Sequence, residues 1–344
     1  MFKNTIIRHK ALIASVIAVV LFALVPLFVH SPYRLDLLII VLVNAGLTIA
    51  FMMMFRTGLL AIAIAVFWGV GGYASAVLTT KLGLSFWLAL PASGLIASLV
   101  ALVLGILLLG RAGGFAFLML CVVLGMLFSL VVGNISFLGG YAGIADIPPP
   151  DPISIPFLGT IEFTSKIPFF YLALILFVVI ILVVTAFYKA WTGRAWTAIG
   201  MNSRLAESIG IDVNKFRLLA FVVSAGLAGL IGSFYANYMS FVIGDTYGMW
   251  INMYILTYAI LGGTGHLILG PIIGTTVMVF MPESLRMAQE IAPVFNGILL
   301  ILLVLVLPGG LLSLWDRRAE IVEWISRTGK TIGSSLSIRR NAGK

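Results

Sequence analysis

The side chains that most often perform chemistry in proteins are few in this sequence, and they do not converge. The chain has one cysteine, Cys121, and three histidines, His9, His30 and His266, all far apart. A lone cysteine forms no internal disulfide, and no Cys/His spacing suits a zinc site. The acidic residues are scattered, and no Ser/His/Asp arrangement is visible. We therefore expect no catalytic site, no metal site and no cofactor bound by this chain, and a membrane-embedded enzyme is the least supported class.

One motif in the C-terminal tail looks like the end of a phosphate-binding loop. Residues 328–331 read Thr-Gly-Lys-Thr, but the position that needs the first glycine is Trp324. The chain is therefore not expected to bind ATP. Any ATP-driven process would need an ATPase on another chain.

The composition indicates a membrane protein. Of the 344 residues, 61% are apolar and 10% are charged, with a mean hydropathy of +1.16, whereas soluble domains carry about 25% charged residues. A spanning helix needs about 20 apolar residues, and several uncharged runs are that long. These runs are 11–33, 37–55, 57–80, 82–110, 112–145, 167–188, 218–244, 246–282 and 291–315. The first is too long for a signal peptide, so we expect it to be a spanning helix.

Glycines divide the two longest of these runs. Run 246–282 contains Gly262-Gly263-Thr264-Gly265, and consecutive glycines favour a turn. Run 112–145 holds one span, to about Val132, followed by a glycine-rich segment. The expected fold class is an all-α polytopic membrane protein with about ten transmembrane helices.

The basic residues assign a side to each loop. If the N-terminus is cytoplasmic, ten spans leave most lysines and arginines on the cytoplasmic side, as the positive-inside rule requires. The basic residues left outside are Arg34, Lys81, Lys166 and Arg286. This bias also explains the net charge of +9 without nucleic acid as a partner. We expect a cytoplasmic N-terminus (1–10), a transmembrane domain (11–315) and a cytoplasmic basic tail (316–344).

Two long segments do not span. The outer loop, 134–167, contains five prolines and is expected to form an extended surface cap. The inner loop, 189–216, is polar, charged and compatible with helix.

Two short helices are expected within the inner loop. The first would break at Gly200, and the second would begin at an N-cap, Asn202 or Ser203, and stop at Gly210. Leu205, Ser208 and Ile209 would then share one face, beside Ala206 and Glu207. Such a helix could rest on lipid headgroups or dock in the groove of a partner.

Uncharged polar residues within the spans are the candidates for a substrate path. Asn44 and Thr48 are i, i+4 neighbours in the second span, and Tyr73 and Ser75 lie in a glycine-rich patch of the third. The alternative is that these residues serve helix packing. No ionisable side chain lies at the middle of a predicted span, which argues against proton coupling.

Small residues recur at helical spacing in two later spans. Ser224, Ala228 and Gly232 form one stripe, and Gly270 and Gly274 form another. We interpret both stripes as helix-packing surfaces, because small residues let helix backbones approach closely.

The inner loop and its continuation resemble the permeases of branched-chain amino acid ABC importers, in particular the second of their two homologous membrane subunits. The family pattern is approximately G-R-A-x-x-A-I-x-x-N-x-x-A-A-E-x-x-G-I-x-V, and over positions 193–213 this chain supplies Gly193, Arg194, Ala195, Ala198, Ile199, Asn202, Ala206, Glu207, Gly210, Ile211 and Val213. Ala220, Phe221, Ser224, Ala225, Ala228, Gly229 and Gly232 continue the match. The turn Leu261-Gly262-Gly263-Thr264-Gly265, the segment Gly139-Gly140 with Gly143, and Pro308-Gly309-Gly310-Leu311 also fit. The similarity extends from about Leu35 to Leu312.

The resemblance implies an importer fold with inverted repeats and no ATP or Mg²⁺ on this chain. It implies a second permease subunit, two cytoplasmic ATPases and a periplasmic or lipid-anchored solute-binding protein, in a bacterial or archaeal cytoplasmic membrane with both termini cytoplasmic. It also implies that the inner loop couples to the ATPase. The matched coupling residues are Gly193, Arg194, Ala198, Asn202, Ala206, Glu207, Gly210 and Ile211.

One segment departs from the family pattern and leaves the solute open. Ala61, Ala63 and Ile64 occupy the serine, glycine and histidine positions of the stretch 58–73 in the third run. Aliphatic amino acids are the expected solutes. Urea, amides and aromatic or other organic acids are alternatives, and a stand-alone secondary carrier is the competing class of transporter.

Overall fold

The computed structural model describes residues 22–28, 31–110, 114–155, 159–284 and 310–316. The helices are α2 (Val25–Phe28), α3 (Pro32–Phe55), α4 (Ile64–Thr80), α5 (Phe86–Leu108), α6 (Gly114–Asn134), α7 (Lys166–Lys189), α8 (Trp191–Met201), α9 (Ser203–Ser208), α10 (Val213–Met239), α11 (Met249–Gly262), α12 (Leu269–Ser284) and α14 (Leu311–Asp316). The 3₁₀ turns are η1 (Ser136–Leu138), η2 (Gly140–Ala142) and η3 (Gly244–Tyr247). The strands are β1 (Ile144–Ala145), β2 (Ile153–Ile155), β3 (Gly159–Ile161) and β4 (Phe241–Val242).

The predicted helical membrane fold is confirmed. Within the described ranges, α3, α5, α6, α7 and α10 are long and apolar enough to cross a membrane. The shorter helices α4, α11 and α12 take the places of the third, eighth and ninth predicted spans. The predictions for the first and tenth spans, the N-terminus and the tail fall mostly outside the described residues. The last residues of the first uncharged run belong to the next helix, since Pro32 starts α3.

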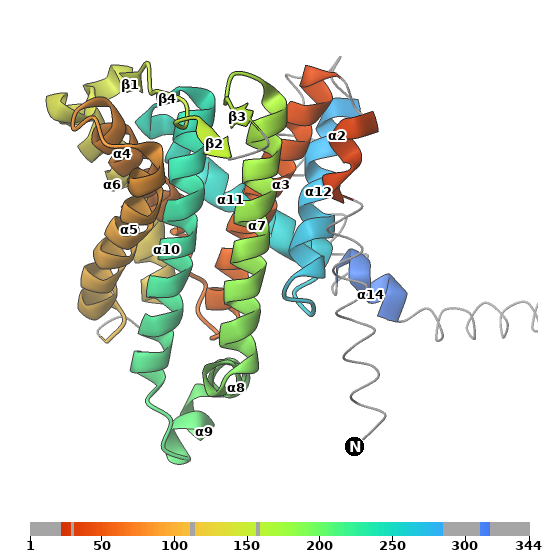
Figure 1. Ribbon diagram of the computed structural model, residues 1–344. Helices are drawn as coiled ribbons and strands as arrows, with labels where there is room; N and C mark the ends of the chain where they lie inside the picture. The colour runs from red at the N-terminus through yellow and green to blue at the C-terminus, as the bar shows by residue number, and fades with distance from the viewer. Residues whose placement is uncertain (1–21, 29–30, 111–113, 156–158, 285–309, 317–344) are drawn as a thin grey trace, which may run out of the picture.

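Helix α10 lies at the centre of the assembly and packs on α4, α5 and α3 (Figure 1). Its small residues allow this approach. A Cβ atom placed on Gly229 would lie 2.5 Å from the Ala97 Cβ of α5, and one on Gly232 would lie 2.0 Å from the Trp68 carbonyl oxygen of α4. Gly232 of the predicted stripe therefore lies at a helix-packing contact, as predicted.

Helix α4 begins at Ile64, whereas the uncharged run starts at residue 57. The difference arises from a turn in which Gly58 takes the left-handed φ of +75°. The first turn of α4 is capped from far away in sequence, because the Ala65 amide donates to the Asn252 side-chain oxygen of α11 at 2.9 Å. Asn252 is buried. It satisfies a backbone donor that would otherwise lack a partner.

The end of the bundle that carries the strands is called here the outer end (Figure 1). There β1 pairs with β4 and β2 with β3, both antiparallel. The proline-rich loop is not wholly extended as predicted, since it also contains the turns η1 and η2. Asp151 attaches this loop to α5, because its carboxylate accepts from the Ser85 hydroxyl at 2.6 Å and from the Phe86 amide at 3.1 Å.

The opposite end, which carries α8 and α9, is called the inner end. Loops that the ten-span prediction assigns to one side meet at one end of the molecule. At the outer end, Lys166 of α7 pairs with Asp36 of α3 at 2.8 Å. At the inner end, Arg217 of α10 donates to the Thr57 carbonyl oxygen at 3.4 Å. The alternation of loops along the chain therefore agrees with the prediction.

Candidate functional site

The 189–216 segment projects from the inner end below α7 and α10 (Figure 1). Its first helix, α8, is held by Trp196, whose side chain is completely buried. The Trp196 indole N–H donates to the Phe216 carbonyl oxygen at 2.8 Å, and its ring stacks on Phe187 of α7 with the centroids 6.0 Å apart. Burial of a large ring with its N–H satisfied is a strong local anchor. The segment is thus fixed at both of its ends.

The predicted pair of short helices is confirmed, with a small shift. Helix α8 continues through Gly200 to Met201, so the break falls at Asn202 rather than at Gly200. Asn202 is the N-cap of α9, accepting from the Leu205 amide at 3.1 Å. After α9, Gly210 takes a φ of +87°, the left-handed conformation that ends many helices.

The tip of the segment exposes apolar side chains. Met201 is 84% exposed, Leu205 63% and Ile209 69%. On the other side, Ile199, Ala206 and Val213 form a small buried cluster. Apolar side chains exposed around a short, well-anchored helix suit a docking surface for a partner.

The matched coupling residues divide between the surface and the interior. Arg194, Asn202, Glu207 and Gly210 are exposed, Ala198 and Ile211 are half-buried, and Gly193 and Ala206 are buried. A Cβ atom on Gly193 would lie 2.1 Å from the Tyr188 carbonyl oxygen. Gly193 and Ala206 therefore shape the segment. The exposed members are those placed to touch a partner.

A residue absent from the sequence candidates, Arg56, joins the 189–216 segment to the rest of the inner end. It caps α3, and its guanidinium donates to the Gly265 carbonyl oxygen in the turn between α11 and α12. Its guanidinium carbon lies 5.9 Å from the centroid of the Tyr188 ring at the end of α7. Arg56 is the sole charge between two apolar runs, but this signal is shared with Lys81, Arg111 and Asp245, so the sequence alone does not single it out.

Glycines close the packing around the turn between α11 and α12. A Cβ atom on Gly262 would lie 1.7 Å from the Gly270 carbonyl oxygen, and one on Gly274 would lie 1.9 Å from that of Tyr258. A Cβ atom on Gly310 would lie 2.4 Å from the Gly263 Cα atom. The turn is therefore in direct backbone contact with its neighbours, and the predicted packing role of the Gly270 and Gly274 stripe is confirmed.

The two path candidates on α3 are bonded within their own helix. Asn44 donates from its side-chain amide to the Ile40 carbonyl oxygen at 2.9 Å, and Thr48 donates to the Asn44 carbonyl oxygen at 2.7 Å. Asn44 is half-buried and Thr48 is completely buried. Their role as a substrate path stays a prediction.

On α4, Ser75 belongs to a buried network. Its hydroxyl donates to the Asn237 side-chain oxygen at 2.8 Å and accepts from the Ser233 hydroxyl at 2.8 Å, both on α10. Asn237 in turn donates to the Pro148 carbonyl oxygen of the proline-rich loop at 2.8 Å. These contacts favour packing as the role of Ser75. An amide within an apolar run is the signal that could have pointed to Asn237.

Tyr73 lies among aromatic rings. Its ring centroid is 6.1 Å from that of Phe128 and 6.3 Å from that of Tyr247. Its buried hydroxyl has no hydrogen-bond partner among the described residues, and neither does the Trp68 indole N–H one turn earlier. No hydrogen bond within the described ranges joins these α4 residues to Asn44 or Thr48.

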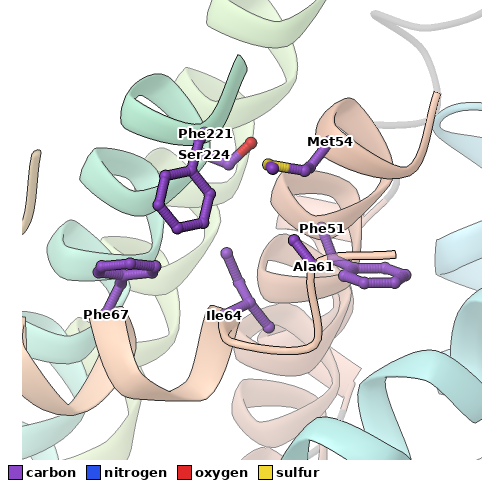
Figure 2. A pocket seen from close by; sticks show the side chains of 7 residues that line it. All are labelled: Phe51, Met54, Ala61, Ile64, Phe67, Phe221 and Ser224. Carbon is purple, nitrogen blue, oxygen red and sulfur yellow. The ribbon is translucent and has the colours of Figure 1, made fainter. Parts of the chain in front are cut away.

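A small cavity lies between α3, α4 and α10 (Figure 2). Its lining residues are Phe51, Met54, Ala61, Ile64, Phe67, Phe221 and Ser224. Ser224 supplies one buried hydroxyl, which has no partner among the described residues. Ala61 and Ile64 stand where the family pattern has serine and histidine, so they make this wall apolar. The four path candidates lie elsewhere.

No group of three or more His, Cys, Asp or Glu side chains that could hold a metal ion occurs in the described part of the chain. The features of this site are a docking surface, a packed loop cluster and an apolar cavity.

Comparison with known proteins gives the family. The family described as "Branched-chain amino acid transport system / permease component" matches residues 33–307. The chain is 28% identical over 278 residues to the high-affinity branched-chain amino acid transport system permease protein LivM of Escherichia coli K12. That match covers 75% of this chain and 64% of LivM, so the chain spans slightly less than two thirds of its relative.

Shorter matches point the same way. The permease protein LivH of Escherichia coli K12 is 33% identical over 127 residues, covering 35% of this chain and 39% of LivH. The autoinducer 2 import system permease protein LsrC of Enterobacter sp. 638 is 35% identical over 80 residues, covering 22% of this chain and 23% of LsrC. No solved structure matches the chain. Because the family match covers more than half of its length, this multi-pass membrane protein belongs to the branched-chain amino acid transport system permease family.

Proposed function

We propose that this chain is a permease subunit of an ATP-binding cassette importer that moves a small amphipathic solute across the cytoplasmic membrane. The observation that carries the proposal is the 189–216 segment, whose two short helices project beyond α7 and α10 with an exposed apolar tip at Met201, Leu205 and Ile209. Anchored by buried Trp196, this segment can pass a force from a docked partner to the membrane helices.

The partners and orientation follow from this role. The inner end faces the cytoplasm, with both termini on that side, and two ATPase subunits dock there and bind the ATP and Mg²⁺. A second, homologous permease subunit completes the membrane domain, and a periplasmic or lipid-anchored binding protein delivers the solute to the outer end. Closure of the ATPases favours one of two conformations of the permease, as a ligand does in a two-state protein.

The proposed solutes are branched-chain and other aliphatic amino acids. The family description and the names of LivM and LivH support this class. Binding of candidate solutes to the purified partner binding protein tests it, because that protein meets the solute first. Preferred binding of urea, an amide or an organic acid would replace the proposed solute and leave the importer class intact.

Two substitutions in the 189–216 segment, one that reverses a charge and one that alters the backbone, test the docking surface. Glu207→Arg and Gly210→Pro should preserve membrane insertion and abolish the link between ATP hydrolysis and uptake in reconstituted vesicles. Glu162→Arg is the matched control, because Glu162 is also an exposed glutamate but lies at the outer end. Normal coupling in both inner-end variants would refute the docking role, and uptake by the chain alone without ATP would show a secondary carrier.

A further inference from the structure

Arg56 touches the 189–216 segment through its backbone. A Cβ atom on Gly200 of α8 would lie 2.2 Å from the Arg56 carbonyl oxygen, so no side chain separates α8 from the end of α3. The contact is also close when measured from the chain that follows α3, because a Cβ atom on Gly58 would lie 3.5 Å from the Gly200 Cα atom. Because packed backbones cannot pass through one another, a displacement of α8 toward α3 must displace the end of α3.

The side chain of Arg56 reaches a third segment, the turn between α11 and α12. Its guanidinium donates to the Gly265 carbonyl oxygen across 209 positions of sequence. The Tyr188 ring, with its centroid 5.9 Å from the guanidinium carbon, lies beside the same group. Among the described residues Arg56 forms no salt bridge. Its side chain therefore interacts mainly with the Gly265 carbonyl oxygen and the Tyr188 ring.

The Nε atom of Arg56 is buried and has no hydrogen-bond partner among the described residues. A buried donor without an acceptor is costly, so such a group in a folded protein calls for an explanation. A second arginine, Arg217, connects the 189–216 segment to the residue next to Arg56. Glu207 of the 189–216 segment acts electrostatically on Arg217, which donates to the Thr57 carbonyl oxygen next to Arg56.

We propose that Arg56 is a positioning residue that carries the displacement of the 189–216 segment to the turn at Gly262–Gly265. This inference rests on the proposed function and goes beyond it by naming the connection. Movement of α8 shifts the Arg56 backbone at Gly200, and the guanidinium pulls on the Gly265 carbonyl oxygen. Because α11 ends at this turn, α12 begins after it and both pack on α3, the two helices follow. The acceptor is a backbone atom, so arginine at position 56 is the side chain whose replacement breaks the link.

The test uses the full complex with the second permease, the ATPases and the binding protein, reconstituted in vesicles. Arg56→Ala should leave ATPase co-purification unchanged and lower the solute moved per ATP hydrolysed by about tenfold, within the range typical of coupled sites. Arg56→Lys keeps a cation with a single donor nitrogen in place of the guanidinium fork and should recover part of the loss. Arg34→Ala is the control, because Arg34 is an exposed arginine of the same helix at the outer end.

A local readout separates coupling from general damage. A cysteine at Thr264, introduced in a Cys121→Ala background, reports the turn through its rate of maleimide labelling. The parent should change its labelling rate when ATP is trapped, and the Arg56→Ala variant should not. If Arg56→Ala fails to insert, Arg56→Lys is compared with the parent in the same way.

The outcomes distinguish the two proposals. A parent complex with no ATP-dependent uptake would refute the proposed function and this inference with it. A working parent whose Arg56 variants couple normally, and whose turn still responds to ATP, would refute the role of Arg56 alone. Loss of co-purification with the ATPases in Arg56→Ala would also overturn it, since Arg56 would then shape the docking surface.

Discussion

The Ser75 hydroxyl donates a hydrogen bond to the Asn237 side-chain oxygen at 2.8 Å, joining α4 to α10 across 162 positions of sequence. The Asn237 side-chain amide also donates to the Pro148 carbonyl oxygen, so this one side chain links α4 and α10 to the proline-rich loop. All three side chains of the network, which includes Ser233, are buried. The network therefore connects the outer surface to the centre of the bundle.

Replacement of the amide should weaken this connection. Asn237→Leu removes the buried acceptor of the Ser75 hydroxyl and the donor to the Pro148 carbonyl oxygen, and we expect the free energy of unfolding to fall by about 1–3 kcal/mol. Thermal unfolding of the purified protein in detergent measures the change. Asn214→Leu is the control, because Asn214 is exposed near the start of the same helix. Equal stability of the two variants would contradict the role of the network.

Trp196 should be the residue on which the position of α8 depends most. Trp196→Ala removes a completely buried ring and the indole hydrogen bond to Phe216. We expect it to cost about 3–5 kcal/mol and to expose the 189–216 segment to protease. Trp250→Ala, at a tryptophan that is 80% exposed, should change neither property. A protease-resistant segment in Trp196→Ala would show that other contacts hold α8.

Gly200 should tolerate no side chain, because α8 meets the Arg56 carbonyl oxygen at that position. The obstructing atom belongs to the backbone, so Gly200→Ala must push α8 away from α3. We expect a loss of about 2 kcal/mol in the free energy of unfolding, typical of overpacking.

Gly110→Ala is the matched control for Gly200→Ala. A Cβ atom on Gly110 would meet nothing within 4 Å. Thermal unfolding and uptake measured on both variants would check the prediction. A Gly200→Ala protein as stable and active as the Gly110→Ala protein would disprove the close approach.

The start of α10 should respond to pH through Asp212. The side-chain bond to Lys215, followed by that from the Lys215 amide, lowers the pKa of the Asp212 carboxyl from its ordinary value. A carboxyl whose pKa is lower in the folded state stabilises the fold above its unfolded pKa of about 4. That contribution is lost as the pH falls through the lower folded value.

Asp212→Asn keeps an N-cap acceptor but cannot titrate, so the acid-induced loss of stability from this position should disappear. Unfolding temperatures measured from neutral pH into the acid range compare the variant with the parent. Lys215→Met should raise the pKa of Asp212 towards its ordinary value and so reduce the acid-induced loss of stability. Identical pH profiles for the parent and Asp212→Asn would rule out this contribution.

Local sequence was sufficient where the cause of the structure is local. The N-cap at Asn202 and the left-handed Gly210 define α9 because a cap and a positive φ act within a few residues. Gly200 shows the limit of that argument. It was expected to break α8, yet it lies within the helix, because its lack of a side chain serves contact with α3.

Composition and the order of charges determined that this protein crosses a membrane as a helical bundle, and which loops share a side, because both follow from the cost of placing charge in lipid. Only the tertiary structure decided which polar groups meet. Arg56 with Gly265, Asn252 with Ala65, and Ser75 with Asn237 are far apart in sequence. Hydropathy and spacing report which face of a helix is buried. They do not report which distant backbone or side-chain atom completes a hydrogen bond, because that depends on how the helices pack.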